Sequence, residues 1–154
     1  MNEGPGNVRE IVVEEVFPHA PETIWKTLTS GELMARWLGM TPAGFAPVTG
    51  NCFTYRTTPA GEWDGVIRCE VLEVIANERF VYSWRGGHEA NVGYGAPLDT
   101  IVTFTLEKVD GGTRLCLVHS GFILPRNDSA YRNMSGGWSQ VVPQIAAITG
   151  EQES

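Results

Sequence analysis

Few residues in this chain have the types and spacing that catalysis or ligand binding would need. His119 is the only histidine in a convincing strand pattern, and it shares a face with Leu115 and Leu117, so it is predicted to point inward. An inward histidine is either a core residue bonded to a backbone carbonyl, or a ligand anchor or general acid–base. Tyr55 and Tyr82 are also predicted to face inward, where their hydroxyls would need hydrogen-bond partners.

Glu15 is the ambiguous carboxylate. Strict alternation puts it on the same face as Ile11 and Val13 in a strand predicted for residues 8–17. Either the strand ends or bulges at Glu15, or the carboxylate points into the interior and needs a partner there.

Motifs for covalent or metal-assisted catalysis are missing from the sequence. It contains no GxSxG, no HExxH and no clustered His and Cys. Cys52, Cys69 and Cys116 are odd in number and widely spaced, which favours free thiols over a disulfide framework or a zinc site. We therefore predict no catalytic residue, no metal and no cofactor, and favour a binding protein over an enzyme.

Length and composition indicate one globular domain covering residues 1–154, with residues 1–7 and 151–154 predicted to be flexible. The formal net charge of −7 argues against nucleic acid or an anionic membrane surface as partner, since both require a basic surface. The N-terminus lacks the pattern of a signal peptide, and no apolar run approaches the length of a membrane span. These features predict a cytoplasmic protein without membrane insertion.

Hydrophobic periodicity and turn signals predict a strand, two short helices, a run of strands and one long helix. Proline in the first turn starts the first short helix, and Ser30 and Gly39 cap and close the second. The predicted strands are residues 8–17, 51–57, 62–75, 79–85, 100–109 and 113–121.

The long helix is predicted to run from an N-cap at Asp128 to a stop at Gly150. Gly136 and Gly137 lie inside it at a cost of about 1 kcal/mol each relative to alanine, which suggests a close approach to the sheet or a bend. Pro143 should kink the helix. Its apolar stripe consists of Met134, Trp138, Val141, Val142, Ile145 and Ile148.

These elements predict an α+β fold, in which a curved antiparallel sheet of six to seven strands wraps around the long C-terminal helix. Four segments carry a family resemblance: FPHAPETIWKTLTSGELMARWLG (17–39), ERFVYSW (78–84), TIVTFTLEKVDGGTRLCLVHSGF (100–122) and GGWSQVVPQI (136–145). They resemble the helix-grip fold of the START-like, or SRPBCC, superfamily, which includes the birch pollen allergen. Within it the chain is similar to single-domain bacterial members of the family named for the activator of the 90-kDa heat-shock protein ATPase.

The resemblance implies a cavity between the sheet and the long helix, opening near the short helices and the strand-end loops. Inward positions are rich in aromatic residues, which either line such a pocket or fill a core. The candidate ligand-binding residues are Trp37, Phe45, Phe53, Tyr55, Tyr82, Trp84, Phe104, His119, Trp138 and Val142.

Three functions are compatible with this reasoning. The preferred one is binding of a small hydrophobic molecule. The second is a cofactor-independent enzyme of cyclase, hydrolase or dehydratase type that uses His119, a tyrosine and Glu15. The third, suggested by the family name, is a protein-interaction domain that acts on a chaperone. Exposed edge strands also make a weak homodimer plausible.

Overall fold

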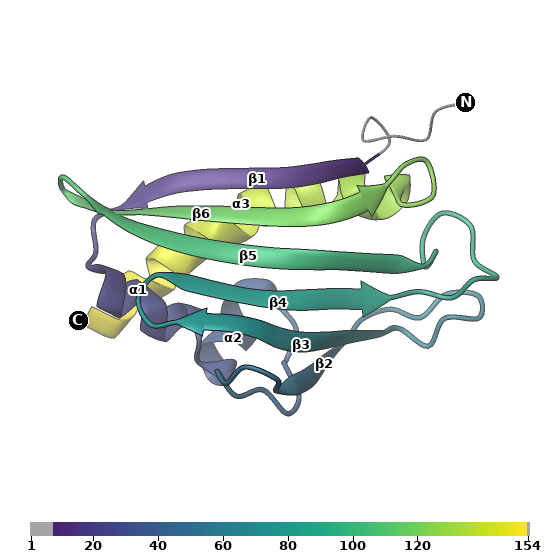
Figure 1. The fold of residues 1–154 in the computed structure, drawn as a ribbon, viewed down its shortest axis with the longest axis horizontal. Coiled ribbons are helices and arrows are strands. Elements are labelled where there is room, and N and C mark those ends of the chain that lie inside the picture. Colours follow the sequence, from purple (N-terminus) through teal and green to yellow (C-terminus); the bar gives the residue numbers. More distant parts are fainter. Residues whose placement is uncertain (1–7, 154) are drawn as a thin grey trace.

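The computed structural model describes residues 8–153, so the predicted flexibility of residues 1–7 and 154 lies outside the described part of the chain. Figure 1 shows a single curved sheet with a long helix crossing it. The elements are β1 (Val8–Phe17), α1 (Pro21–Leu28), α2 (Gly31–Leu38), β2 (Cys52–Arg56), β3 (Val66–Ile75), β4 (Arg79–Gly86), β5 (Leu98–Val109), β6 (Gly112–Ile123) and α3 (Asp128–Glu153).

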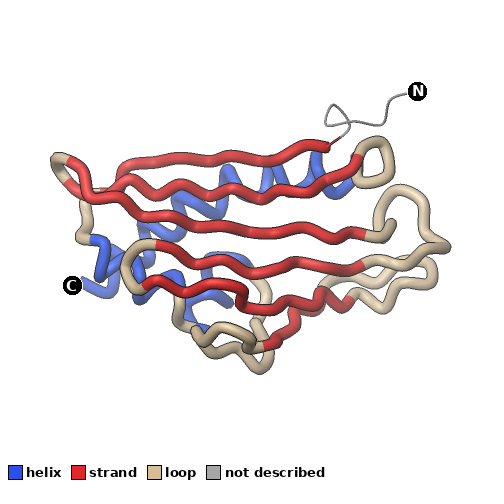
Figure 2. Tube along the Cα trace, viewed as in Figure 1, coloured by secondary structure: helices blue, strands red, loops and turns tan. Residues whose placement is uncertain are grey.

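The sheet has the strand order β1-β6-β5-β4-β3-β2, and every neighbouring pair is antiparallel. Consecutive strands from β2 to β6 are neighbours, whereas α1 and α2 carry the chain from one edge of the sheet to the other. The helices lie together on one face (Figure 2). The predicted α+β helix-grip fold, with two short helices after the first strand, is therefore confirmed.

Local signals explain the two short helices. Pro21 stands in the first turn of α1, where its missing N–H would have no helical partner. The Ser30 hydroxyl accepts a hydrogen bond from the Leu33 N–H at 3.3 Å and so caps α2. Gly39 ends α2 in the left-handed conformation, with φ +84°. The predicted cap and stop of α2 are both confirmed.

Alternation along the strands aligns inward side chains in rows across the sheet. Tyr82 of β4 pairs with Val102 of β5, and Val102 pairs with His119 of β6. All three are fully buried, because α3 and its neighbouring helices cover this face. Such rows give α3 a continuous apolar surface to pack on.

One strand begins later than predicted, and the structure decides between the two alternatives for Glu15. The strand predicted for residues 62–75 begins only at Val66, because Gly65 turns the chain at φ +79° and the Asp64 carboxylate accepts from the Val66 N–H at 3.0 Å. β1 runs through Glu15 to Phe17 without a bulge there. The Glu15 side chain is on the inner face but only half-buried, since β1 is an edge strand from which a carboxylate can reach solvent.

Both predicted ends of the long helix shift outward. The first helical hydrogen bond runs from the Tyr131 N–H to the Asn127 carbonyl at 2.8 Å, so Asn127 takes the capping position predicted for Asp128. The predicted stop at Gly150 is wrong. Gly150 is not among the glycines with positive φ, and α3 continues to Glu153, with Glu151 bound to Arg36 of α2 at 2.9 Å.

The close-approach explanation for Gly136 and Gly137 is also wrong. A Cβ added at either position would have no atom within 4 Å. α3 is continuous through this region and through Pro143, which lies on its exposed side. The glycines therefore leave open space beside the helix.

We predict that Gly136→Ala stabilises the protein by about 1 kcal/mol, because alanine restricts the unfolded chain and meets no clash in the helix. Chemical denaturation would measure the change. Gly39→Ala is the matched control: its Cβ also meets open space, but φ +84° should make the substitution destabilising by about 1 kcal/mol. A destabilised Gly136→Ala variant would contradict this account of the helix.

Candidate functional site

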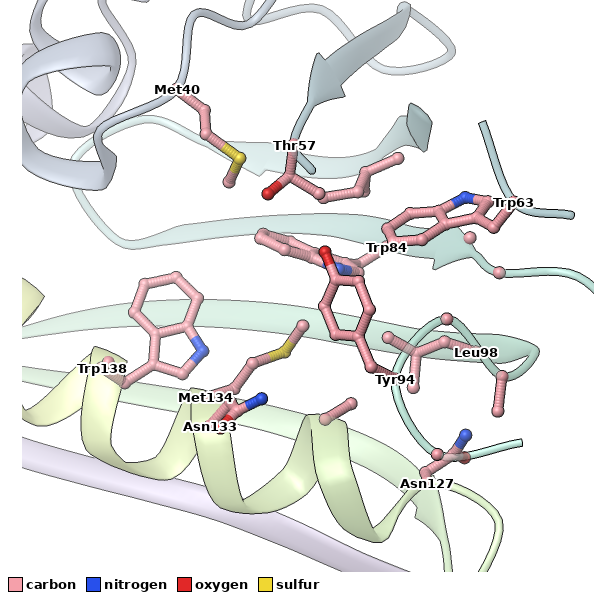
Figure 3. Close-up of a pocket in the computed structure, with 18 of the residues that line it drawn as sticks. Met40, Thr57, Trp63, Trp84, Tyr94, Leu98, Asn127, Asn133, Met134 and Trp138 are labelled. Carbon is pink, nitrogen blue, oxygen red and sulfur yellow. The ribbon is translucent and has the colours of Figure 1, made fainter. Parts of the chain in front are cut away.

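An apolar pocket lies between the N-terminal half of α3 and the loop end of the sheet (Figure 3). Its volume is about 260 Å³. This is the position, between sheet and helix and near the short helices and strand-end loops, that the family resemblance implied. The pocket is therefore the candidate site.

The helix wall of the pocket repeats at three- and four-residue steps, as one face of an α-helix does. It consists of Ala130, Asn133, Met134, Gly137, Trp138 and Val141. The remaining wall comes from the end of α2, from β3, β4 and β5, and from the connections around them. Those residues are Leu38, Met40, Thr57, Trp63, Ile67, Trp84, Gly86, Gly87, Gly93, Tyr94, Gly95, Ala96, Leu98, Arg126 and Asn127.

Aromatic rings and methionine side chains are prominent in the wall of the pocket. Figure 3 shows Trp138 and Met134 projecting from α3, with Trp84 on the sheet opposite and Tyr94 reaching across from its loop. Methionine side chains adapt to irregular shapes, and aromatic rings supply large rigid surfaces. A wall of this kind suits an apolar ligand better than a highly polar one.

Two loops that close this end of the sheet are tied together by Asn91. Its side-chain amide donates to the Ala60 carbonyl at 2.7 Å and accepts from the Glu62 N–H at 3.1 Å. The Tyr94 hydroxyl donates to the Thr58 carbonyl at 2.6 Å. The β2–β3 and β4–β5 connections therefore hold each other in place at the mouth of the pocket.

Glycine is required where the β4–β5 connection begins. Gly87 has φ +88°, and a Cβ there would lie 2.2 Å from the Ala96 carbonyl oxygen. The chain can fold back on itself at this point only without a side chain. The long glycine-rich stretch thus forms an ordered wall of the pocket, with Tyr94 held between Gly93 and Gly95.

His119 lies behind this pocket and joins the sheet to the helix. The Trp138 indole Nε1–H donates to His119 Nδ1 at 3.0 Å, and His119 Nε2 lies 2.7 Å from the Thr100 hydroxyl oxygen. Because an indole can only donate, Nδ1 must be the acceptor and Nε2 carries the proton. The Thr100 hydroxyl then donates to the Trp84 carbonyl at 2.9 Å.

This network keeps the imidazole neutral. Burial lowers the pKa of His119 to about 3. Both ring nitrogens are engaged, the residue is fully buried, and it does not line the pocket. The arrangement orients Trp138, whose ring does line the pocket, and offers no free nitrogen for proton transfer to a ligand.

Of the ten predicted ligand-binding residues, Trp84 and Trp138 line the pocket. Their ring centroids are 6.4 Å apart. Phe45 is half-buried and packs edge-on against Phe53 and Phe80. The other seven are buried in the core behind the pocket: Trp37, Phe53, Tyr55, Tyr82, Phe104, His119 and Val142.

Tyr55 and Tyr82 keep their hydroxyls inside the core. Burial raises the pKa of both phenols, and each also influences the other. Neither hydroxyl meets the geometry of a hydrogen bond with any residue between 8 and 153. The two tyrosines therefore stay protonated, and they do not reach the pocket surface.

Sequence reasoning missed most of the pocket wall, including Met40, Trp63 and Tyr94. Trp63 lies in a stretch predicted as strand, and Tyr94 lies in the glycine-rich connection that shows no periodicity. The only available signal was the length of that connection, since long loops in compact domains are usually functional.

Metal binding has no candidate site within residues 8–153, where no group of three or more His, Cys, Asp or Glu residues could hold an ion. No helix in the same range is long and apolar enough to cross a membrane. The three cysteines are free thiols.

The His119 network predicts a specific dependence of stability on pH. Its folded pKa of about 3 lies below the ordinary value near 6.5, so below pH 6.5 the unfolded chain takes up a proton that the folded chain does not. This contribution is neutral above pH 6.5. As the pH falls toward 3 it destabilises the fold by about 1.4 kcal/mol per pH unit.

Denaturation of wild type and His119→Gln between pH 6.5 and 4.5 would measure this slope, which the variant should lack. His88→Gln, at an exposed histidine, should keep it. NMR titration of the wild type gives a second measurement that does not depend on the variant: the His119 resonances should stay constant over this range. A His119 ring that titrates near pH 6 would refute the prediction.

Comparison with known proteins supports the fold and the family. A family model described as Activator of Hsp90 ATPase homolog 1-like protein matches residues 18–150. No curated protein matches the chain at a significant level. Among solved structures, a protein from Mesorhizobium loti is 33% identical with a TM-score of 0.77, covering 93% of this chain and 98% of its own.

Two further structures are similar in fold. A Chromobacterium violaceum protein is 23% identical with a TM-score of 0.70, covering 91% of this chain and 96% of its own. A Colwellia psychrerythraea structure, described as the Aha1 dimer, is 18% identical with a TM-score of 0.62, covering 90% of this chain and 93% of its own. The match of the family model over most of the sequence shows that this chain belongs to the family of Activator of Hsp90 ATPase homolog 1-like proteins.

Proposed function

We propose that this protein binds a small hydrophobic molecule in the pocket between α3 and the sheet. The observation that carries the proposal is an apolar pocket of about 260 Å³ that none of the surrounding side chains fills. Ligand pockets are concave, mostly apolar and supplied with a few polar groups that fix orientation. Thr57, Asn133 and Arg126 supply such groups here.

Gly137 gives this proposal its sharpest support. The position falls on the pocket stripe of α3, between Met134 and Val141, where an apolar side chain would ordinarily extend the wall. Glycine costs the helix about 1 kcal/mol relative to alanine. Since a Cβ at Gly137 would meet no atom within 4 Å, packing does not demand glycine. We infer that the missing side chain leaves room for a ligand in the pocket.

The catalytic alternative gains no support from the pocket. His119, the residue it relied on, is buried with both nitrogens engaged, and the Tyr55 and Tyr82 hydroxyls do not line the pocket. The chaperone-directed alternative is supported by the family description alone. We therefore keep ligand binding as the proposed function.

Binding of N-phenyl-naphthylamine, an uncharged fluorescent probe, tests the proposal. The wild type should enhance its emission saturably, and the probe should raise the melting temperature by mass action. Gly137→Leu places a side chain in the pocket and should weaken binding by about tenfold or more, a loss of roughly 1.4 kcal/mol.

Gly136→Leu is the matched control, because it makes the same change one residue away at a position that does not line the pocket. It should bind the probe as the wild type does. The absence of saturable binding to the wild type would sink the proposal, and so would undiminished binding to Gly137→Leu with its fold intact by circular dichroism.

Weak self-association through β1 stays a prediction. β1 is the end strand of the sheet, and its outward Val12 and Val16 are 54% and 49% exposed. Exposed edge strands with apolar side chains favour pairing with another chain. Sedimentation equilibrium should show a concentration-dependent mass that Val12→Lys restores to that of a monomer. A constant monomer mass at all concentrations would contradict it.

A further inference from the structure

A second cavity, here called the arginine cleft, adjoins the mouth of the apolar pocket. Its volume is about 260 Å³, and three arginines line it: Arg68, Arg85 and Arg126. Both cavities are lined by Arg126, Gly86, Gly87 and Leu98, so they share part of their walls. Figure 3 places Asn127, the chain neighbour of Arg126, near Leu98 at the end of the pocket away from Trp138.

The charge of this cleft is opposite to that of the whole molecule. The chain has 11 basic and 18 acidic residues and a formal net charge of −7. Nevertheless three arginines meet at the arginine cleft, with Asp99 as the one carboxylate in its wall. A concave site in which one sign of charge predominates attracts ligands of the opposite sign.

The cross-strand register sharpens this point. Arg68 of β3 lies directly opposite Arg85 of β4, and like charges in such a pair destabilise a sheet. Arg85 is bound to Asp99, with Nε 2.9 Å from Oδ1, and Glu70 adds a weaker attraction. Arg68 and Arg126 have no ion pair within the described part of the chain. The site thus has two guanidinium groups that an anion could neutralise.

Arg126 is also the only charged residue among those that line the apolar pocket. The few polar groups of an apolar pocket decide how its ligand is oriented. A guanidinium presents a planar fork of N–H donors that matches carboxylate, sulfonate and phosphate oxygens. The charged end of a ligand would therefore point toward Arg126.

We propose that the ligand is an amphipathic anion, with its apolar body in the pocket and its carboxylate, sulfonate or phosphate group against Arg126 in the arginine cleft. Arg68 and Arg85 reinforce the field there without entering the apolar pocket. This inference rests on the proposed ligand binding and adds the chemical class of the ligand. A neutral hydrophobic molecule would gain nothing from the cleft.

Two probes with the same aromatic frame separate this inference from the proposed function. Anilinonaphthalene sulfonate carries an anionic group, and N-phenyl-naphthylamine lacks it. Arg126→Gln should weaken binding of the sulfonate by about fivefold, the upper range for one exposed charge pair, and leave the neutral probe unchanged. Added salt should weaken binding of the sulfonate probe and leave binding of the neutral probe unchanged.

Arg132→Gln is the control, since Arg132 is an exposed arginine on α3 that pairs with Asp128 and lines neither cavity. It should bind both probes as the wild type does. Gly137→Leu should lose both probes if the sulfonate occupies the same pocket. If the Gly137→Leu variant still binds the sulfonate probe, that probe binds outside the apolar pocket and the inference is overturned.

The remaining outcomes distinguish the two proposals. If the neutral probe binds and Arg126→Gln does not change sulfonate affinity, the anion inference fails and ligand binding stands. Equal loss of both probes in Arg126→Gln would make Arg126 a structural residue and also overturn the inference. If neither probe binds the wild type, both proposals fail together.

Discussion

The hydrogen bond between Trp138 of α3 and His119 of β6 is the contact on which the site depends. It joins the one long helix to β6 and continues through Thr100 of β5 to the backbone of β4. Because the imidazole is buried and must accept from an indole, it is held neutral in one tautomer. A polar link inside an apolar core fixes orientation more strictly than side-chain packing alone.

That link divides the interior into two regions. On the C-terminal side of Trp138, α3 buries Val142, Ile145 and Ile148 against the sheet, and this part of the interior is a packed core. Toward the start of α3, the helix presents Gly137, Met134 and Ala130, and the space beside them stays open. The aromatic residues follow this division: most fill the core, whereas Trp84 and Trp138 have one side on the pocket.

The mouth of the pocket is built from segments without regular structure. Asn91 and Tyr94 tie two loops into one wall by side-chain hydrogen bonds to backbone groups. Next to this wall the sheet ends in an arginine pair, and the chain enters α3 through Arg126. The apolar pocket and the arginine cleft therefore share walls that come from both strand ends and loops.

The sequence by itself determined the architecture, because the local signals agree. Alternation placed the inner faces of the strands, Ser30 and Gly39 bounded α2, and the stripe through Trp138 and Ile145 required a covering sheet. Strand alternation, helix caps and the helix stripe all depend on residues close together in the sequence. The ends of the elements were predicted less well. A helix stop at Gly150 would need a positive φ, which Gly150 does not have, and the helix continues through Glu151, which pairs with Arg36 of α2.

Only the tertiary structure decided which inward residues line a pocket. Alternation gives the same inward direction to Tyr82, which is buried in the core, and to Trp84, which lines the pocket. The difference is distance along the sheet from the loop end, which no periodicity encodes. Gly137, Tyr94 and Arg126 come together from a helix, a loop and a helix start. Long-range packing brings them to one place, and that placement depends on every element between them.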